Sequence, residues 1–377
     1  MKRFDICVIG AGIAGLSLAA RLAHRASVAV IEGESAPGYH ASGRSVAFAH
    51  FGLGERVVRT LTALSLDDLK ARPADDRAAP AEVHPALHIA SQREVPRLDA
   101  LEDVHRAFGC DYVRMSGGEA VRYAPALRTG PDYCYSAILD RGALKLDADA
   151  ILQGHARDIR AMGGELNLGA SVNSIARSGE DWVIDTAAST FTSRILVNAA
   201  GAWADEIANM AGASPIGIEP RRRTVISFPG PHGTDLSQWP FVKTVGDGFY
   251  MLPEGTGQLL ASPMDEGASA PCDAAPEEID IATIAERIEQ STKLTVSRIS
   301  HSWAGLRSFV RDELPVVGFA KDAPGFFWCA GQGGAGFQTS PALSRIGELL
   351  VLREDWPEEL EAKGLNPSLF APSRLGA

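Results

Sequence analysis

The sequence predicts an α/β protein with a parallel sheet, because its first segment alternates between strand and helix patterns. Residues 4–9 are typical of a buried strand, residues 12–23 of a helix, and residues 27–32 of a second buried strand. Two strands joined by a helix in this way belong to one parallel sheet. Farther along the chain, short strand-like segments separated by turn residues predict a second sheet, which is antiparallel.

The remaining elements are expected in the following places. Helices are predicted at residues 55–70, 146–162, 276–292 and 339–352. Strands are predicted at residues 86–91, 133–139, 165–168, 172–176, 182–186, 191–198, 223–228, 248–252, 258–261 and 325–330. Residues 71–82 are rich in Ala, Pro and Asp and are expected to form an exposed loop or a domain boundary.

Composition is that of an ordinary globular protein. The chain has 377 residues, of which 45% are hydrophobic and 22% charged, and a chain of this length is expected to form two domains or one large, elaborated domain. A net charge of −11 argues against binding to nucleic acid or to anionic membrane surfaces. The five cysteines are scattered without a Cys-x-x-Cys pair, so neither a disulfide framework nor a metal site is expected, and a reducing compartment fits best.

The N-terminus has some features of a signal peptide, since Lys2 and Arg3 precede an apolar run. Asp5 interrupts that run, and Arg21 helps to end it short of the roughly 20 apolar residues that a membrane span needs. We therefore expect a cytoplasmic protein with no integral membrane segment.

A glycine-rich turn between the first strand and the first helix predicts dinucleotide binding. Gly10, Gly12 and Gly15 match the Gly-x-Gly-x-x-Gly fingerprint. The first glycine permits a tight turn, the second lets a pyrophosphate approach the backbone, and the third lets the helix pack on the strand. Glu32 ends the next strand, where an acid would accept hydrogen bonds from ribose hydroxyls. A glycine turn in an unrelated α/β domain is the alternative.

Three further segments favour a flavin over a nicotinamide dinucleotide. Small and hydroxylated residues lie at 42–45, a strand ends in small residues and a tryptophan at 199–203, and residues 331–336 form a glycine-rich loop directly before a helix. Such a loop can direct backbone N–H groups and the helix dipole at a carbonyl that gains negative charge on reduction.

These segments, together with the stretch from Gly305 through Arg307 to Gly318, resemble the D-amino-acid oxidase superfamily of FAD enzymes. The resemblance covers nearly the full chain. Within the superfamily the sequence most resembles the bacterial D-arginine dehydrogenase group, and the matching segments are residues 37–40, 42–45, 220–223 and 303–308.

The resemblance implies a discontinuous, Rossmann-like FAD-binding domain and an interleaved α+β substrate domain built on the antiparallel sheet. The FAD-binding domain would comprise residues 1–82, 145–215 and 305–377, and the substrate domain residues 83–144 and 216–304. Members that tether the flavin use a cysteine, and residues 307–315 contain none, so FAD is expected to be bound non-covalently.

The resemblance also implies the residues that bind the cofactor. They are Gly10, Gly12, Ile13, Ala14, Gly15, Glu32, Ser42, Gly43, Arg44, Ser45, Ala47, Val172, Ala200, Gly201, Trp203, Gly305, Arg307, Gln332, Gly333, Gly334, Gly336, Gln338 and Thr339.

An amino-acid substrate needs its carboxylate held, and arginine and tyrosine are suited to this task. The positions carried over from the family are Arg223, Tyr250 and Arg307. Each has an alternative interpretation. Arg307 could form a structural ion pair with Asp312 or Glu313, Arg223 could belong to a solvated surface cluster of three arginines, and Tyr250 could be a core residue.

The pocket for the substrate side chain is expected to contain Phe48, His50, Leu53 and Gly334. The D-arginine dehydrogenase group has a histidine, a tyrosine and a glutamate where this chain has Phe48, Leu53 and Ala86, so a cationic side chain would lack its carboxylate partner. D-Arg and D-Lys are therefore poor candidates, and an apolar D-amino acid is favoured, with Phe51 also contributing. Core packing of Phe48 and Leu53 is the alternative.

The predicted reaction is oxidation at the α-carbon, in which a hydride passes to flavin N5 and leaves an imino acid that water hydrolyses. The sequence offers no convincing Ser/His/Asp or Cys/His set, and this reaction needs none. A secondary amine, such as an N-substituted glycine or an opine, is an alternative substrate, and a 2-hydroxy acid is a lesser one. A flavin-carrying subunit of a larger complex is a third possibility. The electron acceptor and the oligomeric state stay open.

Overall fold

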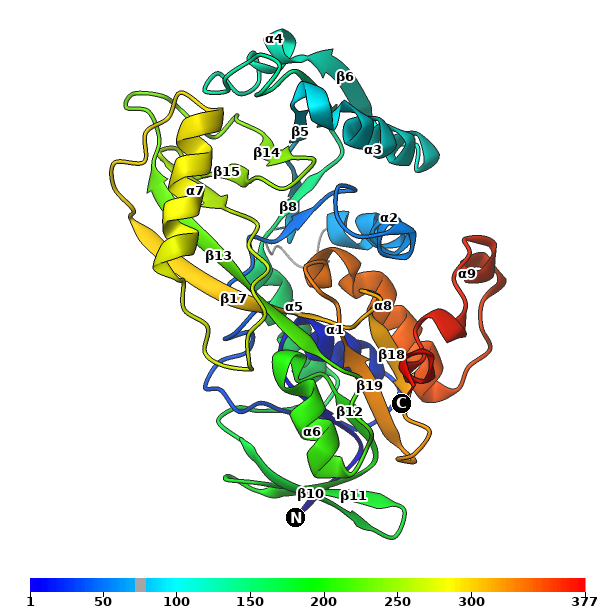
Figure 1. Cartoon of the computed structure of the whole chain (residues 1–377). Helices are drawn as coiled ribbons and strands as arrows, with labels where there is room; N and C mark the ends of the chain where they lie inside the picture. The colour runs from blue at the N-terminus through cyan, green and yellow to red at the C-terminus, as the bar shows by residue number, and fades with distance from the viewer. Residues whose placement is uncertain (72–78, 377) are drawn as a thin grey trace.

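The computed structural model describes residues 1–71 and 79–376, and its framework consists of two eight-stranded sheets with helices packed on them (Figure 1). A third, small sheet consists of β3 (Phe48–Ala49), β8 (Leu144–Leu146) and β4 (Ala81–Val83). This arrangement confirms the predicted fold class, an α/β dinucleotide-binding part combined with an antiparallel sheet.

The first large sheet has a parallel centre. Its strands run in the order β10 (Val172–Ser178), β11 (Asp181–Thr186), β12 (Thr190–Asn198), β1 (Lys2–Ile9), β2 (Val28–Ile31) and β9 (Glu165–Asn167). The end of β12 also pairs in parallel with β19 (Phe326–Ala330), and β18 (Val316–Phe319) pairs antiparallel with β19. The carboxyl ends of β1, β2 and β12 therefore lie together, and in open α/β sheets this is the edge that binds ligands.

Helices cover both faces of this sheet because successive side chains of β1 point to opposite sides. Ile6 and Val8 belong to a core cluster with residues of α1 (Ile13–Leu22), α5 (Ala148–Ala161), α8 (Gly336–Leu352) and α2 (Arg56–Lys70). Cys7 and Ile9 belong to another cluster with α6 (Ala204–Ala211). Each fully buried aliphatic side chain contributes about 1.5–3 kcal/mol to such a core.

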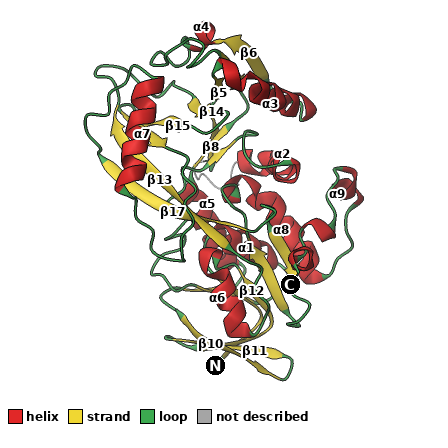
Figure 2. Ribbon diagram, viewed as in Figure 1, coloured by secondary structure: helices red, strands yellow, loops and turns green. Residues whose placement is uncertain are grey.

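The second large sheet is antiparallel except at one pair. Its order is β17 (His301–Phe309), β13 (Glu219–Pro229), β16 (Gln258–Ser262), β15 (Tyr250–Glu254), β14 (Phe241–Thr244), β5 (Ala86–Ala90), β7 (Ser136–Asp140) and β6 (Tyr112–Ser116), with β14 and β5 parallel. One face packs on α7 (Glu278–Ser291), which lies alongside β13 and β15 (Figure 2). Three shorter helices complete the fold: α3 (Val95–Ala107), α4 (Gly117–Ala120) and α9 (Glu358–Ala362).

Several elements differ from the predictions. The strand expected at 223–228 is longer, because β13 pairs with β17 from Glu219 to Ser227, and the helix expected at 339–352 begins three residues earlier, at Gly336. Of the expected loop at 71–82, residues 81–83 form β4, and residues 72–78 lie outside the described residues. Residue 305, at which the last segment of the FAD-binding domain is predicted to begin, lies within strand β17, and the division into two domains stays a prediction. Within the described residues, no helix is long and apolar enough to cross a bilayer.

Candidate active site

The turn between β1 and α1 has a backbone that requires glycine at two positions. Gly10 has a φ of 104°, and an added Cβ there would lie 2.4 Å from the carbonyl oxygen of Ala199. An added Cβ at Gly15 would lie 2.0 Å from the carbonyl oxygen of Gly10. The glycines therefore let this turn, the end of β12 and the start of α1 approach one another closely.

The N-terminus of α1 is directed at the same place. Gly12 is its N-cap, and the N–H of Ile13 donates to Oγ of Ser42 at 3.0 Å. The N–H group of Ala14, which lines the second cavity, has no acceptor within the helix and stays available to a phosphate.

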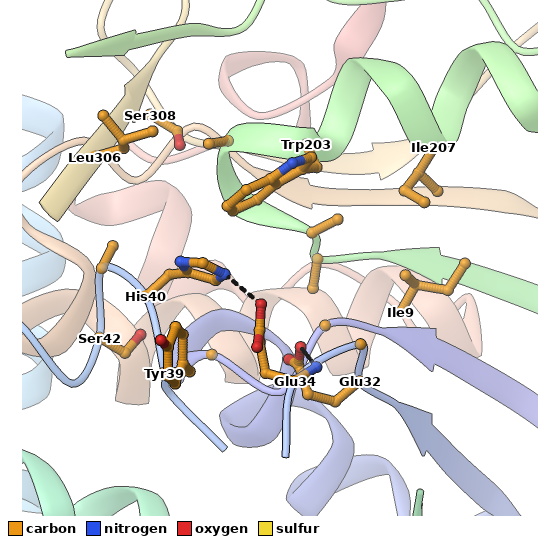
Figure 3. Close-up of a pocket in the computed structure, with 18 of the residues that line it drawn as sticks. Ile9, Glu32, Glu34, Tyr39, His40, Ser42, Trp203, Ile207, Leu306 and Ser308 are labelled. Carbon is orange, nitrogen blue, oxygen red and sulfur yellow. Dashed lines mark hydrogen bonds and ion pairs between the residues drawn. The ribbon is translucent and has the colours of Figure 1, made fainter. Parts of the chain in front are cut away.

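Glu32 lies at the end of β2 beside this turn (Figure 3). Its Oε2 accepts from the N–H of Ala11 at 2.6 Å, and its Oε1 accepts from the N–H of Glu34 at 3.0 Å. These two bonds fix the carboxylate in the cavity wall, where each oxygen keeps a lone pair for a ribose hydroxyl.

Two adjacent cavities extend from the turn. The first, of about 380 Å³, is lined by Glu32, Val172 and Trp203 among others, and the ring of Trp203 lies 4.5 Å from that of His40. His40 in turn contacts Glu34, with Nε2 2.9 Å from Oε1 (Figure 3). The second cavity, of about 220 Å³, reaches from Gly12 to the antiparallel sheet. Because both cavities share Gly12 in their walls, the pair fits an elongated dinucleotide with its two halves on either side of the pyrophosphate.

Most of the predicted cofactor residues line one or both of these cavities. In the first lie Gly10, Glu32, Val172, Ala200 and Trp203, in the second Ile13, Ala14, Ser45, Ala47, Arg307, Gln332, Gly333, Gly334, Gly336 and Gln338, and in both Gly12, Ser42, Arg44, Gly201 and Gly305. The cavity walls do not include Gly15, Gly43 or Thr339. An added Cβ at Gly43 would lie 2.5 Å from the carbonyl oxygen of Gly38, and Thr339 Oγ1 donates to the carbonyl of Ala335, so these residues support the site by packing.

The second cavity is closed by the face of the antiparallel sheet that points away from α7. Side chains alternate along each strand, so Arg223 of β13, Tyr250 of β15 and Arg307 of β17 all lie on this face. Register fixes their neighbours: Arg223 pairs with Gly305, and Tyr250 pairs with Lys243 of β14. The three residues predicted to hold a carboxylate therefore meet in one cavity, although they come from three strands far apart in sequence.

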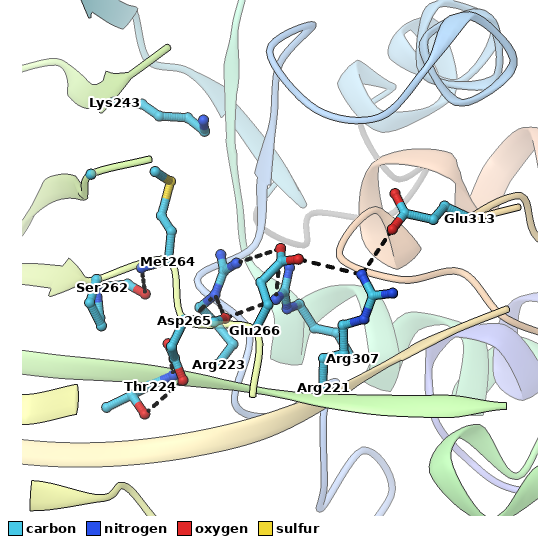
Figure 4. A network of polar contacts seen from close by, with 12 residues as sticks. Arg221, Arg223, Thr224, Lys243, Ser262, Met264, Asp265, Glu266, Arg307 and Glu313 are labelled. Atoms are coloured by element: carbon cyan, nitrogen blue, oxygen red, sulfur yellow. Dashed lines mark hydrogen bonds and ion pairs between the residues drawn. The ribbon is translucent and has the colours of Figure 1, made fainter. Parts of the chain in front are cut away.

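A carboxylate of the chain itself lies among the arginines (Figure 4). Oε1 of Glu266 is 3.2 Å from Nη2 of Arg307 and 3.4 Å from Nη2 of Arg223, and its Oε2 is 3.4 Å from Nη1 of Arg221. Arg307 and Arg223 also donate to the backbone carbonyl of Asp265. The arginines thus already bind an anion in the geometry that a substrate carboxylate would need.

Two alternative interpretations of the arginines are wrong. Asp312 pairs with Arg374 and Glu313 with Arg221, so neither is the partner of Arg307. The side chain of Arg223 is only 17% exposed, because β13 is an inner strand, so the arginine cluster is not a solvated surface. Burial lowers the pKa of the Arg307 guanidinium to about 10, and its buried Nε has no hydrogen-bond partner among the described residues.

Tyr250 is buried and lines the same cavity. Among the described residues its hydroxyl has no hydrogen-bond partner, so it stays able to donate to a bound carboxylate.

Aromatic side chains form the wall beside the arginines. Phe48 stacks on Phe241 with ring centroids 4.5 Å apart, and the ring of His50 lies 5.3 Å from Phe241. Leu53 also lines the cavity, and an added Cβ at Gly334 would lie 3.4 Å from Cδ of Arg307. Burial, together with Lys243, lowers the pKa of His50 to about 3, so this imidazole is neutral.

Two expectations for the pocket are corrected. Phe51 stacks on Phe108 with centroids 5.0 Å apart and does not line the cavity. Ala86 is buried in β5 beside Phe241 and does not line it either. In addition, the sequence prediction missed Lys243, Phe241 and Glu266. Phe241 and Lys243 lie two residues apart in one strand and therefore share a face, which would have placed both in the cavity, but that strand was not predicted.

His88 is a core residue of β5. Its ring lies 5.3 Å from that of His50, and burial lowers its pKa well below the usual value. Among the described residues no group of three metal-ligating side chains is found.

Comparison with known proteins gives the family. The model of the DAO family, described as FAD dependent oxidoreductase, matches residues 5–349. The chain belongs to this family. Its cofactor is FAD, and the two cavities and the α1 N-terminus supply the environment that such a cofactor needs.

The relatives share low identity with the chain over most of its length. Hydrogen cyanide synthase subunit HcnC of Pseudomonas aeruginosa is 24% identical, covering 95% of each chain. The crystal structure of glycine oxidase from Geobacillus kaustophilus superposes with a TM-score of 0.79 and 22% identity, over 97% of this chain and 99% of that one. L-proline dehydrogenase from P. horikoshii superposes with a TM-score of 0.80 and 20% identity, over 100% and 98%. At this identity the structures establish the fold. Several members of the family act on carbon–nitrogen donors, as the names glycine oxidase and L-proline dehydrogenase indicate.

Proposed function

We propose that this protein oxidises the carbon–nitrogen bond of an amino acid whose carboxylate is held by Arg223, Arg307 and Tyr250. The observation that carries the proposal is the convergence of two guanidinium groups and a free phenol in a cavity next to the cofactor site. A buried arginine requires an anion. Without substrate, Glu266 provides that anion, and because its side chain is half exposed, a substrate carboxylate would be able to displace it.

The chain's own residues hold and orient the substrate. Bidentate contacts from the guanidinium groups would fix the carboxylate, and the Tyr250 hydroxyl would donate a further hydrogen bond. Phe48 and Phe241 exclude water from one side of the cavity. When bound, FAD supplies the electron acceptor that takes up the hydride from the α-carbon. The neutral His50 adds no positive charge that would disfavour a cationic transition state.

We propose a D-amino acid in preference to its L-form because of the resemblance to the D-arginine dehydrogenase group at residues 42–45, 220–223 and 303–308. D-Arg and D-Lys remain poor candidates, since none of the described residues that line the cavity beside Phe48 and Phe241 carries a carboxylate.

The test is anaerobic mixing of the purified yellow protein with a panel of D- and L-amino acids, N-alkyl glycines, opines and 2-hydroxy acids, with flavin bleaching as the readout. Arg307→Ala should lower the rate of bleaching at subsaturating substrate by about 10²-fold or more, since it removes charge-assisted hydrogen bonds worth about 1.5–3 kcal/mol each. Arg194→Ala, which removes an exposed arginine paired with Glu180, is the matched control. Bleaching that survives intact in Arg307→Ala would exclude the carboxylate clamp.

Two other candidates keep the same site. A secondary amine with a carboxylate would use the clamp equally well, and the L-proline dehydrogenase among the structural relatives is named for such a substrate. Bleaching by N-alkyl glycines or opines alone would favour it. A flavin-carrying subunit of a larger complex is suggested by the name of the HcnC relative, and a yellow protein that no member of the panel reduces would favour that role.

A further inference from the structure

A second positive group lies in the same cavity as the arginines. Lys243 is on β14, on the face of the sheet that carries Phe241, and its register partner is Tyr250. Figure 4 shows it apart from the cluster of Arg221, Arg223, Arg307 and Glu266. The cavity therefore presents positive charge at two separate places.

The ammonium of Lys243 has only a neutral partner. Nζ donates to the backbone carbonyl of Thr244 at 3.1 Å, and no carboxylate of the described residues lies within 4.0 Å of it. The arginines, in contrast, have Glu266 and the carbonyl of Asp265. An ammonium with three donors and one acceptor has hydrogen-bonding capacity left for a ligand.

The residues around Lys243 determine whether its side chain is charged and able to bind an anion. Its strand neighbours are His88, which burial keeps neutral, and Tyr250, while the charged groups that act on it are Arg223, Asp247 and Glu266. Burial, followed by the charge of Arg223, lowers the pKa of Lys243 to about 8. The group is therefore still mostly protonated at pH 7, in an aromatic wall where an anion would meet less competition from water.

We propose that Lys243 binds a second anionic group of the substrate, so that the preferred substrate is a dicarboxylate with one carboxylate at the arginines and the other at Lys243. This inference rests on the proposed function and specifies its substrate class. The second carboxylate has two sources, either an acidic side chain of an α-amino acid or a carboxyalkyl group on the amine nitrogen.

The apolar pocket predicted from Phe48 and Leu53 is then one part of the binding site, and Lys243 is the other. Phe48, Phe241 and Leu53 would contact the carbon chain between the two carboxylates, and Lys243 would select the charge at its end. A neutral side chain of equal length would leave the ammonium buried without an anion, which is the source of discrimination.

The first experiment measures discrimination in the holoenzyme. The rates of flavin reduction are compared for glutamate against glutamine and aspartate against asparagine, each in D- and L-form, and for iminodiacetate against sarcosine. The wild-type protein should favour the acidic member of at least one pair by roughly 30-fold, the ratio that corresponds to about 2 kcal/mol for a buried charge pair. The pair that shows the preference identifies the source of the second carboxylate.

Lys243→Met should remove the preference by lowering the rate with the acidic substrate while leaving its neutral partner within about threefold, and Lys243→Arg should retain part of it. Lys293→Met is the matched control, because that ammonium also donates to a backbone carbonyl, of Pro125 at 3.4 Å, but is exposed and lines neither cavity. Flavin content verifies that each variant is folded.

Binding of unreactive acids gives a readout that does not depend on turnover. In the wild-type protein, glutarate should perturb the flavin absorbance at a lower concentration than butyrate. In Lys243→Met, the two acids should do so at the same concentration. If Lys243→Met weakens both acids equally, or neither, or if the wild-type protein reduces its flavin faster with every neutral partner, the inference is overturned while the proposed function stands. If no amine on the panel reduces the flavin, the proposed function itself fails.

Discussion

Replacing Glu266 by glutamine tests whether its carboxylate occupies the place of a substrate carboxylate. The wild-type oxygens lie 3.2–3.4 Å from Arg307, Arg223 and Arg221, but the side chain is 49% exposed, so each contact resembles a surface ion pair. At about 0.2–1 kcal/mol per pair, the three contacts together stabilise the protein by about 1–2 kcal/mol. Glu266→Gln should therefore lower the melting temperature of this 377-residue chain by about 1–3 °C.

The same change should improve the binding of substrate. A substrate carboxylate must displace Glu266 to reach the arginines, so removal of that competitor should lower KM by up to about tenfold, the factor that corresponds to 1.4 kcal/mol. Thermal unfolding and steady-state kinetics measure the two effects, which have opposite signs. Glu277→Gln is the matched control, because Glu277 is equally exposed and pairs with Arg222 on the opposite face of β13. An unchanged melting temperature with a raised KM would refute the reasoning, since Glu266 would then position the arginines instead of competing for them.

Three other predictions concern the cofactor and the pH dependence. Gly10→Ala should yield protein that binds little FAD, because the new Cβ would lie 2.4 Å from the Ala199 carbonyl at a φ of 104°, and flavin stoichiometry after purification measures this. Acid precipitation should release all the flavin and leave a protein of unmodified mass, whereas a yellow pellet would show a covalent link. The affinity for glutarate should fall as pH rises above the Lys243 pKa of about 8 and level off at the affinity of Lys243→Met, because deprotonation removes the second cation and leaves only the arginines to bind a carboxylate. Lys243→Met should not show this dependence.

The sequence was sufficient to predict the part of the fold that follows local rules. The β1–α1–β2 unit has a strong apolar pattern and a glycine turn, and the structure gives a steric reason for the glycine at positions 10 and 15. The cofactor residues along this unit followed from the same pattern. The gathering of Arg223, Tyr250 and Arg307 was not predictable from pattern alone, because it depends on pairing among β13, β15 and β17, and it came from the family resemblance instead.

The alternative interpretations of the arginines were wrong because the pattern of charges in the sequence does not show which side chains are buried. Three adjacent arginines resemble a surface cluster, yet in β13 alternate side chains point to opposite faces, so Arg222 meets Asp280 on α7 while Arg221 and Arg223 meet Glu266. Each acid comes from a segment more than 40 residues away in sequence, and no local rule connects them. The alternative partners considered for Arg307, Asp312 and Glu313, were wrong for the same reason, since these nearby acids pair with other arginines.

Lys243 shows how a missed strand conceals a functional residue. The segment 241–244 is only four residues long, too short to show a clear alternation, and its partners β5 and β15 lie on either side of it in space. Once the strand is placed, alternation assigns Val242 to the core beneath α7 and Lys243 to the cavity. If Lys243 binds the second carboxylate as proposed, the preference for a dicarboxylate arises because alternation along this four-residue strand directs Lys243 into the cavity. Comparing the wild-type protein with Lys243→Met measures how much this one side chain contributes to the preference.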